Sequence, residues 1–278
     1  MDLSLRSALT EIPETRLPTF ASNGLEARAK VIGRITESAW EYLATLFGER
    51  PEVQILVLSE ADWPSKGRVE LFGLPNADEG TLVVAGEDAA WWSDLAPLAG
   101  EAGRDEIAAV YGSTDGRLDL GPLFDLVAVH EVAHLFAEPS VRFPRLWLGE
   151  LFANLCLHAW VEMCAPRSLP TLMTLPRLAA NAAADAFEFR TRAAFEEAYA
   201  SIPGPNYAWY QFRLMVEAQT LFQASGEEPA RRLYNMFRID DADAVGDDAT
   251  TGPAIDDVAL AARLAEVDPQ LADFSLAF

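Results

Sequence analysis

Two histidines stand four residues apart in the stretch VAVHEVAHLF, residues 127–136, with a glutamate directly after the first. Residues four apart lie on one face of a helix, so His130 and His134 point the same way and Glu131 lies on the adjoining edge. Two neutral imidazoles suit a divalent ion such as zinc, and a nearby carboxylate can take a proton from water there. The spacing predicts a metal site with a general base beside it.

Two considerations favour a metal at these histidines: the motif is rare by chance, and buried imidazoles need partners. The chain holds three histidines, and with about two dozen glutamates random placement would give His-Glu-x-x-His in roughly three chains per thousand. The alternative is a pair of hydrogen-bonded histidines in an apolar helix. Burying two imidazoles without partners is costly, and an ion supplies those partners. We therefore expect one zinc ion per chain.

A catalytic zinc site needs a third protein ligand. After the loop EPSVRFPR, the apolar segment 146–164 carries a polar residue at every fourth position, namely Glu150, Asn154, His158 and Glu162. If the loop folds this helix back against the first, Glu150 reaches the ion and Asn154 holds a ligand imidazole. Glu138 is the weaker alternative ligand, because three successive turns of one straight helix do not readily face one ion. His158 is expected to hydrogen-bond at a helix seam, and Glu162 to be solvated.

Several helices and a small sheet must position these residues. Helical spacing of apolar residues predicts helices at 24–50, 119–138, 146–164 and 205–223 and near 257–267. Short β-branched runs between turn residues predict strands at 53–59, 67–73 and 80–86. Since the strands come before most of the helices, we predict an α+β fold.

Three ranges describe the expected organisation. Residues 1–23 form an irregular arm, residues 24–120 a helix with a small β-sheet, and residues 121–278 a helical lobe that holds both ligand helices. The last two ranges form one compact catalytic unit. The acidic, turn-rich stretch 238–257 is predicted to be a solvated loop.

The composition narrows the class of function. The 278 residues include 43 acidic and 21 basic ones, for a net charge of −22, and half are hydrophobic. Such a surface repels nucleic acid and anionic lipid, so neither is an expected partner. Cys156 and Cys164 lie eight apart in one predicted helix, too far for a disulfide. With no targeting segment or apolar membrane span apparent, a cytoplasmic protein is expected.

The motifs HEVAH and WLGELFANL resemble the gluzincin zinc metallopeptidases, especially the relatives of aminopeptidase N. In that family a second helix begins Trp-Leu-x-Glu-x-Phe-Ala and its glutamate is the third zinc ligand, here Glu150. The resemblance spans roughly residues 122–240 and implies a zincin-like fold, with the strand at 80–86 as the edge of the substrate groove. It also implies an oxyanion donor on a later helix, Tyr210, with Tyr207 as the second choice. The Gly-Ala-Met-Glu-Asn exopeptidase motif and the amino-terminal β-domain have no counterpart.

The expected activity is zinc-dependent hydrolysis of peptide bonds in a peptide or protein substrate. Zinc on His130, His134 and Glu150 would lower the pKa of bound water to about 7 and polarise the carbonyl. Glu131 would relay the proton to the leaving amine, and the tyrosine would donate to the oxyanion. Two alternatives remain: a zinc-binding protein with a structural or partner-binding role, and a helical interaction module without metal.

Overall fold

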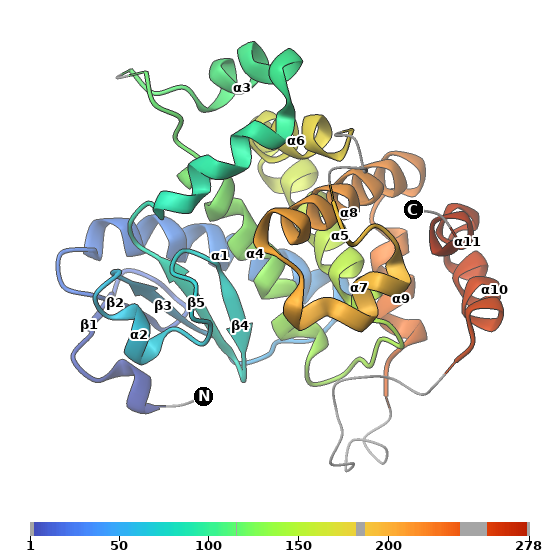
Figure 1. Ribbon diagram of the computed structural model, residues 1–278. Helices are drawn as coiled ribbons and strands as arrows, with labels where there is room; N and C mark the ends of the chain where they lie inside the picture. Colours follow the sequence, from blue (N-terminus) through green and yellow to red (C-terminus); the bar gives the residue numbers. More distant parts are fainter. Residues whose placement is uncertain (1–2, 115, 182–186, 240–254, 277–278) are drawn as a thin grey trace. The chain divides into compact units, whose positions relative to one another are not determined.

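The computed structural model describes residues 3–114, 116–181, 187–239 and 255–276. The chain forms two compact units, one of residues 1–94 with 111–139 and one of residues 95–110 with 140–278. The ranges expected from the sequence, 1–23, 24–120 and 121–278, divide the chain differently, because the helix of the HEVAH motif packs on the sheet. Figure 1 labels the elements. The α+β class is as predicted, with a small mixed sheet and many helices.

The first unit is built on a sheet that has five strands in the described part of the chain. Its elements are η1 (Leu3–Arg6), β1 (Thr10–Glu11), β2 (Thr19–Ala21), α1 (Glu26–Phe47), β3 (Gln54–Leu58), α2 (Trp63–Lys66), β4 (Asn76–Asp78), β5 (Thr81–Ala85) and α4 (Gly121–Ala137). The strand order is β1-β2-β3-β5-β4. The three central strands are parallel, and β1 and β4 pair antiparallel at the two edges.

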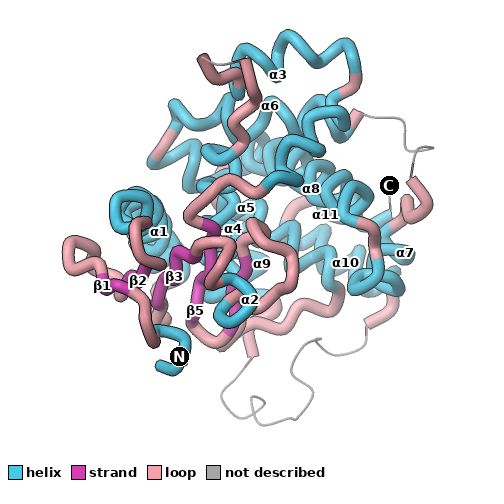
Figure 2. The backbone as a smooth tube through the Cα atoms, turned by 60° about the vertical axis from the view of Figure 1, so that its left-hand side comes forward, coloured by secondary structure: helices cyan, strands magenta, loops and turns pink. Residues whose placement is uncertain are grey.

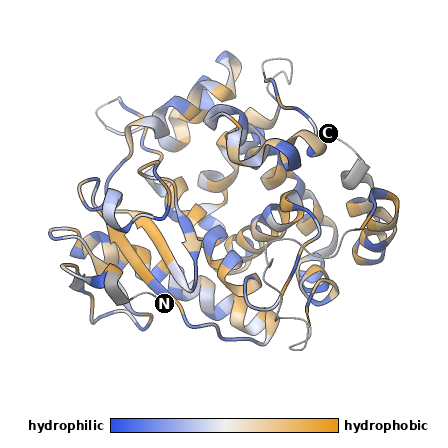
Figure 3. Ribbon diagram, turned by 60° about the horizontal axis from the view of Figure 1, so that its bottom comes forward, coloured by the Kyte–Doolittle hydropathy of each residue, from blue (hydrophilic) through white to orange (hydrophobic). Residues whose placement is uncertain are grey.

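The predicted strands at 53–59 and 80–86 are confirmed as β3 and β5. Every residue of both strands is buried, as expected for parallel strands covered on both faces, and Figure 3 shows these central strands in the orange of hydrophobic residues. However, β5 lies inside the sheet between β3 and β4. The expectation that 80–86 forms the edge is therefore wrong, and β4 is the edge strand on that side of the sheet.

Two other expectations about strands are wrong. Residues 67–73 form turns and bends, and three of their carbonyls accept hydrogen bonds from tryptophan side chains. Indole N–H groups of Trp63, Trp91 and Trp92 donate to the carbonyls of Val69, Phe72 and Gly73, at 2.7 to 3.0 Å. The predicted irregular arm at 1–23 contains β1 and β2, which are only two and three residues long. Strands this short show no sequence period.

Helices α1 and α4 cover the sheet and contact each other. α1 packs on β2 and β3, and α4 packs on β4 and β5. The rings of Trp40 and Phe47 on α1 lie against Phe136 on α4, with centroids 6.2 and 6.0 Å apart. α1 ends at Gly48, whose φ of 75° is the left-handed conformation that favours glycine after a helix. The helix predicted at 24–50 is thereby confirmed.

The described elements of the second unit are helical, and Figure 2 shows the strands, in magenta, only in the first unit. The chain passes between the units within η2 (Ala90–Ala99). The further elements are η3 (Glu101–Gly103), α3 (Arg104–Tyr111), α5 (Leu146–Cys164), η4 (Pro166–Ser168), α6 (Leu169–Ala180), α7 (Arg192–Ala198), η6 (Tyr199–Ser201), α8 (Gly204–Ser225), α9 (Glu228–Met236), α10 (Asp257–Val267) and α11 (Pro269–Leu276). α5 contacts α7, α8 and α9 within this unit.

The helices predicted at 119–138, 146–164, 205–223 and 257–267 are confirmed as α4, α5, α8 and α10, whereas the helices α2, α3, α6, α7, α9 and α11 were not predicted. The predicted loop at 238–257 lies mostly outside the described residues. Both cysteines are free thiols, as expected. No helix within the described residues has the length and apolar character needed to cross a membrane.

Candidate metal centre

The two histidines of the HEVAH motif face each other across one turn of α4. Their Nε2 atoms are 3.0 Å apart, and the rings are inclined at 70° with centroids 4.7 Å apart. His130 is buried and His134 is partly buried. Two lone-pair-bearing nitrogens this close can share one proton or one cation. The structure thus brings together the pair of nitrogen donors that the spacing predicted.

Helix α4 is held in place along its length. Asp119 Oδ1 accepts from the Gly121 amide at 2.9 Å, which satisfies a backbone donor at the start of the helix. Asp125, one turn before the histidines, forms a two-pronged ion pair with Arg28 of α1. Burial raises the pKa of Asp125, and the Arg28 guanidinium opposes that rise. The ion pair and the packing on α1 and the sheet fix the helix that carries the histidines.

Glu138, the weaker alternative ligand, has a different contact at the end of α4. Its Oε1 atom accepts from the backbone amide of Glu79 at 3.1 Å. Glu79 and Gly80 connect β4 to β5 with φ values of 46° and 73°, the double left-handed turn typical of a tight hairpin. The exposed Glu138 side chain therefore anchors this turn to the helix.

Glu150, the preferred third ligand, is buried near the start of α5 and is held by two donors. Its Oε1 atom accepts from the Tyr199 hydroxyl at 2.9 Å, and its Oε2 atom accepts from Gln211 Nε2 at 2.7 Å. The same Gln211 nitrogen donates to the Tyr207 hydroxyl at 2.8 Å, and the Tyr199 and Tyr207 hydroxyls are 3.5 Å apart. The negative charge of Glu150, burial and Tyr207 raise the pKa of Tyr199, which keeps this hydroxyl protonated.

Asn154 supports this carboxylate through Gln211. Its amide nitrogen donates to the Glu150 carbonyl at 3.0 Å and to Gln211 Oε1 at 3.2 Å. The second contact fixes the Gln211 amide with its oxygen toward Asn154 and its nitrogen toward the Glu150 carboxylate. A contact with a ligand imidazole remains a prediction for Asn154.

The amino end of α5 is capped by side chains of α7. The Trp147 amide donates to Glu196 Oε1 at 3.0 Å, which satisfies one of the open donors of the first turn and places a negative charge at the positive end of the helix dipole. The guanidinium of Arg192 lies 4.1 Å from the Trp147 ring centroid, in a cation–π contact. Arg192 also forms a buried ion pair with Glu217 of α8, at 2.8 Å. α7 thus ties the start of the ligand helix to α8.

The Tyr210 hydroxyl, the predicted oxyanion donor, makes a hydrogen bond to the backbone. It donates to the Thr191 carbonyl at 2.8 Å, and the side chain is fully buried. Burial raises the pKa of Tyr210 to about 12. Thr191 is the residue before α7, so this bond connects α8 to the start of α7. Of the two candidate tyrosines, Tyr207 is the one whose hydroxyl belongs to the cluster around Glu150.

The lower part of the polar stripe on α5 holds a neutral histidine. His158 is 1% exposed, and in the described part of the chain neither ring nitrogen makes a hydrogen bond. Its Nε2 atom is 3.5 Å from Glu162 Oε1, and its ring stands edge-on to Phe222 with centroids 5.4 Å apart. Burial lowers the pKa of His158 to about 4. The expected hydrogen bond at a helix seam is therefore not found, and Glu162 is partly buried instead of fully solvated.

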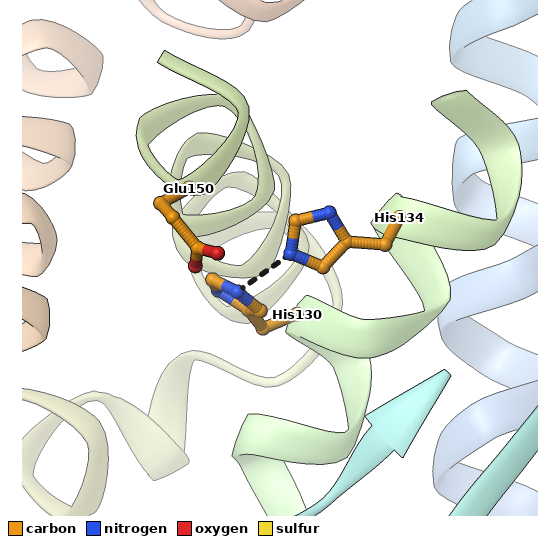
Figure 4. Close-up of side chains that lie close together, drawn as sticks. All are labelled: His130, His134 and Glu150. Carbon is orange, nitrogen blue, oxygen red and sulfur yellow. Dashed lines mark hydrogen bonds between the residues drawn. The ribbon is translucent and has the colours of Figure 1, made fainter. Parts of the chain in front are cut away.

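His130, His134 and Glu150 form a group that could hold a metal ion. One potential ligand atom from each lies within 4.8 Å of the others. Figure 4 shows the two rings projecting from successive turns of α4 and the Glu150 carboxylate turned toward them. The group has two nitrogen donors and one oxygen donor, and all three residues were selected from the sequence.

Sequence reasoning missed Tyr199 and Gln211. Gln211 lies one helical turn after Tyr207, so its place beside that tyrosine could have been found from the spacing. Tyr199 offers no such signal, because it stands in a short 3₁₀ turn far from Glu150 in the sequence. Searches against protein-family models and against curated proteins find no match to this chain.

Proposed function

We propose that this protein is a zinc-dependent metallopeptidase with a zincin-like fold of the gluzincin type. His130, His134 and Glu150 would hold the ion. The observation that carries this proposal is the convergence of these three ligand atoms within 4.8 Å. The resemblance of HEVAH and WLGELFANL to gluzincin motifs supports the same assignment.

The donor set fits a zinc ion. Two imidazole nitrogens at about 2.05 Å from one tetrahedral ion are about 3.3 Å apart, close to the observed 3.0 Å between the Nε2 atoms. The carboxylate of Glu150 adds the oxygen donor of a His₂Glu site, a known composition of catalytic zinc. When bound, zinc supplies Lewis-acid chemistry, which polarises a carbonyl group and lowers the pKa of water.

Glu131 is the proposed proton carrier. It follows His130 directly on α4 and is partly buried. Its carboxylate would take the proton from the attacking water and pass it to the leaving amine nitrogen. Tyr207 is the proposed donor to the carbonyl oxygen as that atom gains charge, because its hydroxyl belongs to the cluster around Glu150. This choice replaces Tyr210, which donates to Thr191.

The sheet edge supports a peptide as the substrate. β4 is an edge strand and packs against α4, the helix that carries the histidines. An extended peptide can add to such an edge through main-chain hydrogen bonds. A strand at the sheet edge that packs against the histidine helix therefore favours an extended peptide over a compact small molecule as the substrate.

Metal content and a peptide digest test the proposal together. Protein purified without added metal should carry about one zinc per chain, and His130→Ala, His134→Ala and Glu150→Ala should each lower occupancy sharply. Wild-type protein should cleave peptides of a mixed library, and a chelator should abolish cleavage. Full occupancy in Glu150→Ala would remove Glu150 as a ligand. Zinc without cleavage would identify the alternative, a non-catalytic zinc-binding protein.

Glu131→Gln separates catalysis from metal binding. Glutamine nearly preserves the shape of glutamate but cannot take the proton. We expect this variant to keep about one zinc per chain and to lose peptide cleavage. Cleavage at the wild-type rate would refute the role of Glu131 as the base, and loss of zinc would make Glu131 a structural residue.

A further inference from the structure

Both carboxylate oxygens of Glu150 receive a hydrogen bond from elsewhere in its own unit. Tyr199 in η6 donates to Oε1 and Gln211 on α8 donates to Oε2, at 2.9 and 2.7 Å. Each carboxylate oxygen has two lone-pair positions, so an oxygen that accepts one hydrogen bond can still bind a cation. These contacts therefore orient the carboxylate without blocking it.

We infer that Tyr199 and Gln211 are positioning residues that fix the Glu150 carboxylate for metal binding, an inference that rests on the proposed function. The side chain of glutamate has three rotatable bonds, and a free carboxylate would lose that freedom only when the metal binds. Two donors on separate elements settle its direction beforehand. Partners of this kind typically change metal affinity by about 10- to 100-fold.

The two donors are themselves fixed. Gln211 is oriented by Asn154, whose amide nitrogen donates to Gln211 Oε1 at 3.2 Å. Tyr199 packs its ring edge-on against Phe195, which is fully buried, at 5.1 Å between centroids. The element before it, α7, begins at Arg192, which is held in a buried ion pair with Glu217. The orientation of Glu150 thus depends on α7 and α8 as well as on its own helix.

Metal titration of two variants tests this inference. Metal-free wild type, Tyr199→Phe and Gln211→Met are titrated with Zn²⁺ against a chromophoric chelator, and Tyr210→Phe serves as the matched control. Tyr210 is also a buried tyrosine, but its hydroxyl donates to a backbone carbonyl. We expect about 10-fold or greater weakening in Tyr199→Phe and Gln211→Met, and less than about 3-fold in Tyr210→Phe.

The visible spectrum of the Co²⁺-loaded protein separates positioning from a general loss of stability. A reoriented carboxylate changes the ligand field, so the spectra of Tyr199→Phe and Gln211→Met should differ from wild type. That of Tyr210→Phe should not. Wild-type affinity in both test variants, or weakened binding with an unchanged spectrum, would overturn the inference and leave the metal site standing. A wild type that binds neither ion would overturn the site and the inference together. If Tyr199→Phe does not fold, Gln211→Met decides alone.

Discussion

At the residue scale, three tyrosine hydroxyls near the start of α8 differ in the groups they contact. Tyr199 and Tyr207 belong to the cluster around Glu150, whereas Tyr210 donates to the Thr191 carbonyl. They lie within twelve residues of one another in the sequence. Only the direction of each ring, set by packing, assigns them to different contacts.

Kinetics on two variants test this division. Tyr207→Phe should keep zinc and lower turnover of a cleaved peptide by about 10²- to 10³-fold, the usual loss on removing one oxyanion donor. Tyr210→Phe should leave turnover nearly unchanged and reduce the free energy of unfolding by about 1 kcal/mol, because it removes one buried hydrogen bond. The reverse pattern would restore Tyr210 as the donor, the role predicted from the sequence.

His158 makes stability depend on pH. Its pKa is about 4 in the folded protein, below the 6.5 of an exposed histidine, because burial disfavours the charged form. The unfolded state therefore binds more protons between these values, and the free energy of unfolding falls as the pH decreases from about 6.5 to about 4. The neighbouring Glu162, which attracts the protonated ring, acts against this loss.

Replacing His158 with leucine should remove this part of the pH dependence. The histidine is expected to lower the free energy of unfolding by on the order of 3 kcal/mol between about pH 6.5 and about pH 4. We expect urea unfolding of metal-free His158→Leu to show a smaller fall in unfolding free energy between pH 7 and pH 4.5 than metal-free wild type. Equal pH dependence in the two proteins would contradict the assignment.

At the element scale, α5 depends on α7 for the cap of its first turn. Arginine precedes α5 at Arg145 and provides no side-chain cap. The acceptor comes instead from Glu196, forty-nine residues further along the chain. The Glu196 carboxylate thus lies at the backbone amide of Trp147, three residues before the proposed ligand Glu150. This contact explains how a helix rich in buried residues begins at a defined position.

Glu196→Ala should destabilise the protein by about 1 kcal/mol, as does the loss of other caps. The matched control is Glu197→Ala, because Glu197 is the exposed neighbour on the same helix. Chemical unfolding of the metal-free variants measures both changes. An equal effect of the two substitutions would show that the cap contributes no more than general helix charge.

At the scale of the whole molecule, acidic residues exceed basic ones by 22. Repulsion among like charges destabilises a compact state, and salt screens charges that are exposed. The exposed ion pairs of the surface contribute little and lose strength in salt. The net repulsion is therefore expected to dominate the response to ionic strength.

Raising NaCl from about 0.02 to 0.3 M should increase the thermal midpoint of the metal-free protein, because the Debye length falls over this range from about 20 to about 6 Å. Scanning calorimetry or circular dichroism measures the change. A midpoint that falls with salt would mean that exposed ion pairs, such as Lys30 with Glu14 and Arg50 with Glu41, outweigh the net charge.

The sequence by itself determined the features that depend on neighbours along the chain. The four-residue period that aligns His130 with His134 is a property of one helix, and so is the stripe that begins at Glu150. The apolar runs of β3 and β5 and the glycine that ends α1 are equally local. These elements were predicted because each needs only a few consecutive residues to define its pattern.

Only the tertiary structure decided which distant groups meet. Indole donors from Trp91 and Trp92 bond to carbonyls of the segment 67–73, and β4 lies outside β5 at the edge of the sheet. Tyr199 reaches Glu150, whereas Tyr210 turns to Thr191. A hydroxyl or a carbonyl can bond with any partner that packing brings within about 3 Å, and that choice leaves no period in the sequence.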